Sequence, residues 1–151
     1  MFLKNRAITA AFSTIFALGF VSAATSVKAG YAPQKFSCTN STLQGDYASS
    51  ATGFVNGSTP FNLVYLDRFD GNGNITGVKG ATSTGGQVSE NLSDSGTYQV
   101  NSDCTVSLTF VSASGSQSTN FGVIADRGRK IYVIGTGSGG NISSIFEKVN
   151  R

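Results

Sequence analysis

Short runs in which apolar and polar residues alternate recur from about residue 45 to the end of the chain. The clearest run covers residues 105–111, where Val106, Leu108 and Phe110 alternate with hydroxyl residues. Alternation with a period of two places the apolar side chains on one face of a β-strand. No segment of this region shows helical apolar spacing over a useful length. The pattern therefore predicts an all-β domain.

Glycine-rich polar turns separate these runs. The segment Asp70-Gly-Asn-Gly-Asn74 lies between Phe69 and Ile75, and Asn and Gly tolerate the positive φ angles of a tight reversal. We therefore expect the tip of a β-hairpin here. Strands are predicted over residues 45–54, 61–69, 74–84, 87–92, 96–100, 105–111, 117–125, 130–135 and 142–149.

Eight or nine short strands joined by turns favour a single antiparallel β-barrel of about eight strands, with a β-sandwich as the alternative. Closure would remove the edges that a weakly charged sheet otherwise exposes. The strand at 61–69 is apolar on both faces, because Val64 and Leu66 alternate with Phe61, Leu63 and Tyr65. This indicates a strand packed on two sides, or an apolar patch that something covers.

The first 29 residues predict a secretory signal peptide. Lys4 and Arg6 precede an apolar run over 7–24, and the compact residues Val27 and Ala29 suit a cleavage site after Ala29. We therefore expect a signal peptide at 1–29, an irregular lead-in at 30–44 and a β-barrel domain at 45–151. The mature protein is expected to be secreted or periplasmic, with no membrane span.

The net charge of +3 comes entirely from the predicted signal peptide. Three of the eleven basic residues lie there, which leaves eight basic residues against eight acidic ones. A nucleic-acid footprint needs a surplus of basic charge, so nucleic acid is not an expected partner. The local cluster of Arg127, Arg129 and Lys130 is interpreted as a solvated hairpin turn.

The two cysteines, Cys38 and Cys104, predict a disulfide in an exported protein. It would close a loop of 67 residues, 38 to 104 inclusive. Loop-closure entropy gives such a cross-link roughly 4 kcal/mol. The rival interpretation, a nucleophilic cysteine, lacks an imidazole base because the chain contains no histidine.

The absence of histidine also removes Ser-His catalysis and the usual zinc ligand. A hydrolase with paired carboxylates remains open. The candidate carboxylates are Asp46, Asp67, Asp70, Glu90, Asp94, Asp103, Asp126 and Glu147. Most lie in or beside turns, where Asp hydrogen-bonds its own backbone. We therefore assign no catalytic residue and no cofactor.

A weak metal candidate lies in the same turn as the predicted hairpin tip. Asp70, Asn72 and Asn74 have the spacing that begins many calcium loops. Ile75 stands where the loop glycine belongs, and Ala81 stands where an acidic residue should close the site. Hairpin chemistry alone explains the composition, so no metal is expected.

Binding of a small apolar molecule is the function that the sequence favours, since an eight-stranded barrel can hold one. The candidate lining residues are Tyr47, Tyr65, Phe110, Phe121 and Tyr132. Plain core packing is the competing interpretation of these rings. Richness in Ser, Thr, Asn and Gly supports another function, a structural or interaction protein of the cell surface. The oligomeric state stays open.

Several short motifs of the chain are similar to those of a known group of proteins. Leu43-Gln-Gly-Asp-Tyr47, Gly53-Phe54, the turn at 69–74, Gly96-Thr-Tyr98 and Asp103-Cys-Thr105 resemble a group of small exported bacterial proteins of unassigned function. Their form is similar to calycin or allene-oxide-cyclase-like barrels. The resemblance covers residues 38–148 and implies a barrel.

The resemblance also suggests functional residues, which this chain matches in part. Lipocalins open with Gly-x-Trp and close with a late basic residue; here Tyr47 replaces the Trp, and Lys148 or Lys130 could supply the charge. A cyclase of this barrel type, the remaining alternative function, would need a buried glutamate. Only Glu90 and Glu147 are available.

Overall fold

The computed structural model describes residues 36–138 and 140–149. Within them the chain forms nine strands and two short 3-10 turns. The strands are β1 Gln44–Val55, β2 Thr59–Asp70, β3 Asn74–Thr84, β4 Gln87–Leu92, β5 Asp94–Val100, β6 Thr105–Ser112, β7 Gln117–Ala125, β8 Lys130–Gly135 and β9 Gly140–Lys148. The turns are η1 Asn40–Thr42 and η2 Asp126–Gly128. The predicted strands are all present, with bounds close to those expected.

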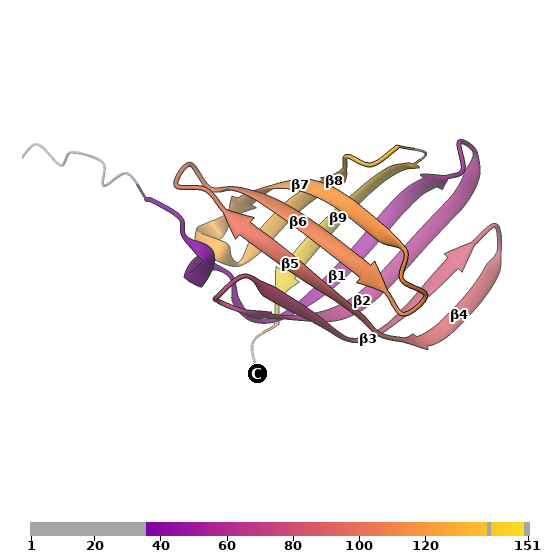
Figure 1. Cartoon of the computed structure of the whole chain (residues 1–151), viewed down its shortest axis with the longest axis horizontal. Coiled ribbons are helices and arrows are strands. Elements are labelled where there is room, and N and C mark those ends of the chain that lie inside the picture. Colours follow the sequence, from indigo (N-terminus) through magenta and orange to yellow (C-terminus); the bar gives the residue numbers. More distant parts are fainter. Residues whose placement is uncertain (1–35, 139, 150–151) are drawn as a thin grey trace, which may run out of the picture. The chain divides into compact units, whose positions relative to one another are not determined.

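Eight of these strands form a closed antiparallel barrel (Figure 1). The order runs β2-β1-β9-β8-β7-β6-β5-β3, and pairing of β2 with β3 closes the ring. Strand β4 pairs with β3 outside the ring. The predicted barrel is thus confirmed, and the sandwich alternative is not adopted.

One edge of β3 is divided between two strands. Residues Asn74, Ile75 and Thr76 pair with β5, whereas the far half of β3, from Gly80 to Thr84, pairs with β4. An extra residue, Val78, forms a bulge where the pairing of β3 with β2 shifts register. Bulges bend a strand and increase its twist. The β3–β4 hairpin therefore extends past the ring (Figure 1).

The two ends of the barrel differ. We call the end with the β2–β3, β5–β6 and β7–β8 turns the closed end, and the opposite end the open end. Phe69 lies at the centre of the closed end, with its ring 4.9 Å from Tyr47, 5.1 Å from Tyr98 and 6.0 Å from Phe146. Leu43, buried with them, comes from the segment before β1. The closed end is therefore a packed hydrophobic core.

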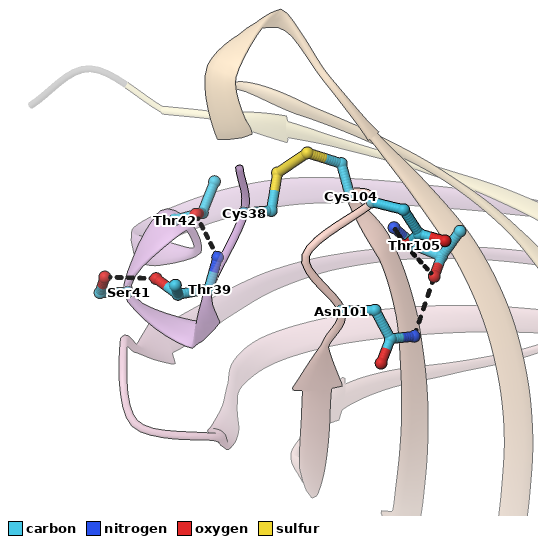
Figure 2. Close-up of a disulfide and its surroundings, with 8 residues drawn as sticks. Cys38, Thr39, Ser41, Thr42, Asn101, Cys104 and Thr105 are labelled. Atoms are coloured by element: carbon cyan, nitrogen blue, oxygen red, sulfur yellow. Dashed lines mark hydrogen bonds between the residues drawn. A yellow bond between two sulfur atoms is a disulfide. The ribbon is translucent and has the colours of Figure 1, made fainter. Parts of the chain in front are cut away.

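The segment before β1 is tied to this core. The Tyr98 hydroxyl donates to the backbone oxygens of Asn40 at 3.1 Å and Leu43 at 2.8 Å, and Val100 N donates to Asn40 Oδ1 at 2.8 Å. The predicted disulfide joins Cys38 to Cys104 in the β5–β6 turn (Figure 2). Residues 36–43 are therefore anchored at both η1 and the disulfide.

The turn at 70–74 is the tip of the β2–β3 hairpin, as predicted. Asp70 Oδ1 accepts from Asn72 N at 2.7 Å and Asn74 N at 2.9 Å, and Oδ2 accepts from Asn74 Nδ2 at 2.6 Å. These bonds, with the Asn74 side chain contributing most, lower the pKa of Asp70 to about 2. Both carboxylate oxygens of Asp70, the first residue of the weak metal candidate, thus accept hydrogen bonds that hold the turn.

The basic cluster lies in the β7–β8 connection and its flanks, as the solvated-turn interpretation requires. Arg129 Nε lies 3.5 Å from Asp126 Oδ2, and Lys130 Nζ lies 2.7 Å from Glu147 Oε1. Each of these side chains is at least a third exposed, so the pairs contribute little to stability.

Among residues 36–138 and 140–149, no helix has the length and apolarity needed to cross a membrane. The predicted signal peptide at 1–29 and the first residues of the lead-in lie outside the described residues.

We expect Phe69→Ala to destabilise the protein by about 3–5 kcal/mol, since it leaves a cavity among three aromatic rings. The control is Phe54→Ala, because Phe54 is 49% exposed and faces outward; its cost should stay below about 1 kcal/mol. Urea unfolding followed by tyrosine fluorescence measures both. Equal losses would show that Phe69 is not the centre of the core.

Candidate functional site

On two adjacent strands, β1 and β9, small inward-facing side chains follow the large ones of the closed end. On β1 the inward series runs from Tyr47 through Ser49 to Ala51, and on β9 it runs from Phe146 to Ser144. Small side chains cannot fill the barrel at this level. They leave a cavity of about 910 Å³ in the open half.

The wall of this cavity has an apolar middle and a hydroxyl-rich mouth. The larger apolar side chains are Phe61, Leu63, Tyr65, Leu92, Phe110, Ile142 and Phe146. Serines of the β6–β7 hairpin and the β8–β9 connection line the mouth: Ser112, Ser114, Ser116, Ser118 and Ser138. The cavity therefore offers apolar contact inside and hydrogen bonds at its entrance.

Among the described residues that line the cavity, Asp67 and Asp94 are the only acidic ones, and none is a lysine or an arginine. Asp67 points inward from β2 beside the closed-end core and is only 2% exposed. Its Oδ2 accepts a hydrogen bond from Ser49 Oγ at 2.6 Å. The Asp67 carboxyl therefore lies at the floor of the cavity.

Asp94, the first residue of β5, reaches the same floor through a gap left by a glycine. A methyl group at Gly77 would overlap the Asp94 carboxyl group, so only glycine leaves room for it there. Gly77 is itself the cross-strand partner of Asp67. The two carboxyl groups are therefore neighbours, although 26 residues separate them in the sequence (67 to 94, exclusive).

Burial shifts the ionisation of both groups. Desolvation raises the pKa of Asp67 to about 7; the hydrogen bond from Ser49 opposes this, and the charge of Asp94 adds to it. Desolvation also raises the pKa of Asp94 to about 6. Asp94 Oδ1 is buried and accepts no hydrogen bond within the part of the chain that the structure describes. Between about pH 6 and pH 7 the two carboxyl groups are therefore partly protonated.

The five predicted lining residues divide among three places. Tyr65 and Phe110 line the cavity. Tyr47 is buried in the closed-end core, where Lys148 Nζ lies 5.9 Å from its ring centroid. Phe121 and Tyr132 point outward and are 42% and 49% exposed. Of the two candidates for the late basic residue, Lys148 is the one that contacts Tyr47.

Phe121 and Tyr132 belong to an exposed apolar strip across the outer face of β7, β8 and β9. Phe121 pairs with Ile134, Val123 pairs with Tyr132, and Tyr132 pairs with Ile145. All five side chains are at least 40% exposed. We call these five residues the outer apolar strip.

Sequence reasoning missed the carboxyl pair. Asp67 and Asp94 were both among the eight candidate carboxylates, without an indication that they meet. One signal was present: Asp67 shares its strand face with Phe61, Leu63, Tyr65 and Phe69, and a charged residue on an apolar face is unusual. The position of Asp94 depends on long-range pairing of β3 with β5, which no local pattern encodes.

Comparison with models of known protein families, with curated proteins and with solved structures found no match.

The carboxyl pair predicts an unusual dependence of stability on pH. The raised pKa of Asp67 means that the folded state holds its proton more tightly than the unfolded state does. Stability should therefore fall as pH rises from about 4 to about 8, by roughly 4 kcal/mol from Asp67. Urea unfolding at a series of pH values measures this slope.

The matched variants for this measurement are Asp67→Asn and Asp126→Asn. Asn can still accept from Ser49 but does not titrate, so Asp67→Asn should flatten the slope. Asp126 is 71% exposed at the closed end, and its replacement should leave the slope unchanged. A wild-type protein that gains stability between pH 5 and pH 8 would contradict the buried-carboxyl explanation.

Proposed function

We propose that the protein is an exported binding protein that holds one small molecule in the open half of its barrel. The observation that carries this proposal is the cavity of about 910 Å³ above a packed floor. Ligand pockets for small molecules are commonly about 300–1,000 Å³ and mostly apolar, with a few polar groups that fix orientation. The cavity fits that description in both size and lining.

Rigidity of the walls supports the same function. Around the ring each strand is hydrogen-bonded to neighbours on both sides, at least at the closed end. At the closed end, the disulfide and the Tyr98 hydrogen bonds join the segment before β1 to β5 and the β5–β6 turn. A ligand would therefore enter a largely preformed site and would not have to order it, which favours affinity.

Export is part of the proposal. The predicted signal peptide supports it, and a disulfide is typical of oxidising compartments outside the cytoplasm. The resemblance of the turn motifs to small exported bacterial proteins with calycin-like barrels points the same way. A secreted or periplasmic carrier is the role that we infer from these features together.

The two alternative functions have less support. A cyclase of the allene-oxide-cyclase type would need a buried glutamate, but Glu90 and Glu147 are both exposed. Glu147 also pairs with Lys130 on the outer surface. A structural or interaction protein could use the outer apolar strip, but nothing in the structure indicates what would cover it. We therefore rank both below the carrier.

Filling the cavity should abolish binding. The probe is N-phenyl-1-naphthylamine, a neutral fluorophore whose emission rises in an apolar environment. We expect saturable binding of one probe molecule per wild-type chain. Ser144→Phe places a ring inside the cavity and should weaken binding by about tenfold or more, since it occupies the space of the ligand.

The matched control is Ser143→Phe. Ser143 is adjacent in sequence but exposed on the outer face of β9, so this variant should bind the probe like the wild type. Thermal unfolding confirms that both variants are folded. Binding that survives Ser144→Phe unchanged, or that never saturates in the wild type, would rule out an internal site.

A further inference from the structure

We propose that the Asp67–Asp94 pair makes this cavity a site for an organic cation, an amphiphilic amine whose ammonium group contacts both carboxyls while its apolar body fills the cavity above. The inference rests on the proposed binding function and names the class of ligand. It replaces the purely apolar ligand that the sequence favoured with one that carries a positive charge.

The first argument is geometric. Cross-strand partners have Cβ atoms about 4.5–5.5 Å apart, and the Asp94 carboxyl occupies the place of a Cβ at Gly77, the partner of Asp67. One ammonium group has three donors and can therefore reach both carboxyls at once. Ser49 already donates to one oxygen of Asp67, which fixes the orientation of that carboxyl.

The second argument is the missing donor. Asp94 Oδ1 is buried and has no hydrogen-bond partner among the described residues. Buried polar atoms are almost always paired, and an unpaired one lowers stability because it has lost its hydrogen bonds to water. A ligand that donates a hydrogen bond at this position would recover part of that stability. Charge-assisted bonds to a carboxylate are about twice as strong as neutral ones.

The third argument is the sign of the charge. The cavity wall carries Asp67 and Asp94 and no basic side chain among the described residues. The basic side chains nearest in sequence point elsewhere: Arg68 faces outward and pairs with Asp46, and Lys79 is exposed on β3. A cation would be attracted to the floor, whereas a carboxylate ligand such as a fatty acid would be repelled.

The walls above the floor suit the rest of such a molecule. The inward side chains of β2 from Asp67 to Phe61 span six residues, or about 20 Å of strand, which strand tilt reduces to roughly 15 Å along the barrel axis. That depth accommodates a short alkyl chain. Aromatic rings at Tyr65 and Phe110 add apolar contact and faces that attract cations.

Proton exchange should accompany binding. The titratable side chains that line the cavity are Tyr65 on β2, Asp67 on β2 and Asp94 on β5. Burial, with smaller contributions from both aspartates, raises the pKa of Tyr65. Its hydroxyl therefore stays neutral at the pH values of the binding experiment below. Because the pKa values of the two aspartates lie near 7 and 6, a cation that enters at neutral pH displaces a proton.

The test compares three ligands of one shape and different charge: n-octylamine, 1-octanol and octanoate. Each competes with N-phenyl-1-naphthylamine for the full-length mature protein. At about pH 8 we expect the amine to bind about tenfold tighter than the alcohol, and the alcohol tighter than the carboxylate. Affinity for the amine should fall by about tenfold toward pH 5 while that for the alcohol stays constant.

Two variants assign the preference to the carboxyl pair. Asp94→Asn and Asp67→Asn should each bring the amine and the alcohol to similar affinity, while binding of the alcohol is retained. Asp126→Asn removes the same charge at the closed end and should leave the wild-type preference intact. Asp94→Asn removes an unpartnered carboxylate, so loss of folding is not expected to obscure the result.

The outcomes separate this inference from the proposed function. Suppose that the alcohol and the amine bind the wild type with equal affinity and that Ser144→Phe abolishes both. This result would overturn the cation site and leave the proposed carrier function intact. Tightest binding of octanoate would also overturn the cation site. Failure of all three ligands and of the fluorophore to bind would overturn both.

Discussion

Ring closure at β3 is the constraint on which the rest of the structure depends. A barrel closes only when each strand finds neighbours on both sides, and β3 meets this requirement by sharing one edge between β5 and β4. The contact with β5 is only three residues long. It is sufficient to seal the closed end around Phe69, but it leaves the far half of β3 to a hairpin outside the ring. This division matches the asymmetry of the barrel, which is packed at one end and hollow at the other.

The same junction places the carboxyl pair. Gly77 and the bulge at Val78 lie where β3 passes from β5 to β4, and the Asp94 carboxyl enters the space over Gly77. A buried Asp67 carboxyl beside a half-buried Asp94, whose Oδ1 has no hydrogen-bond partner among the described residues, is unfavourable for a fold that could have used apolar side chains there. Features that lower stability and break local rules concentrate at functional sites, because only function compensates for them. The proposed ligand class therefore rests on the floor of the cavity and not on its aromatic wall.

The local pattern of apolar, polar and turn residues is sufficient to predict the strands and hairpins. Alternation in 105–111 and the turn at 70–74 depend on neighbouring residues, so both could be read directly. Which face of a strand turns inward was harder where both faces are apolar. Phe121 and Val123 mark one face of β7, yet the strand turns Gly122 and Ile124 inward, with Gly122 opposite Val106, and leaves Phe121 and Val123 outside. The aspartate pair depends on contacts between distant strands, which a single sequence does not contain.

The gradient from packed to hollow also divides individual strands. Strand β1 begins in the core at Tyr47 and ends at the mouth near Val55, so one continuous hydrogen-bonded ladder passes through two environments. Amide exchange with solvent depends on local opening, which is easier where few buried contacts resist it. Protection within β1 should therefore decline along its length. A bound ligand would act on the weaker half of the strand and would leave the half beside Phe69 as it is.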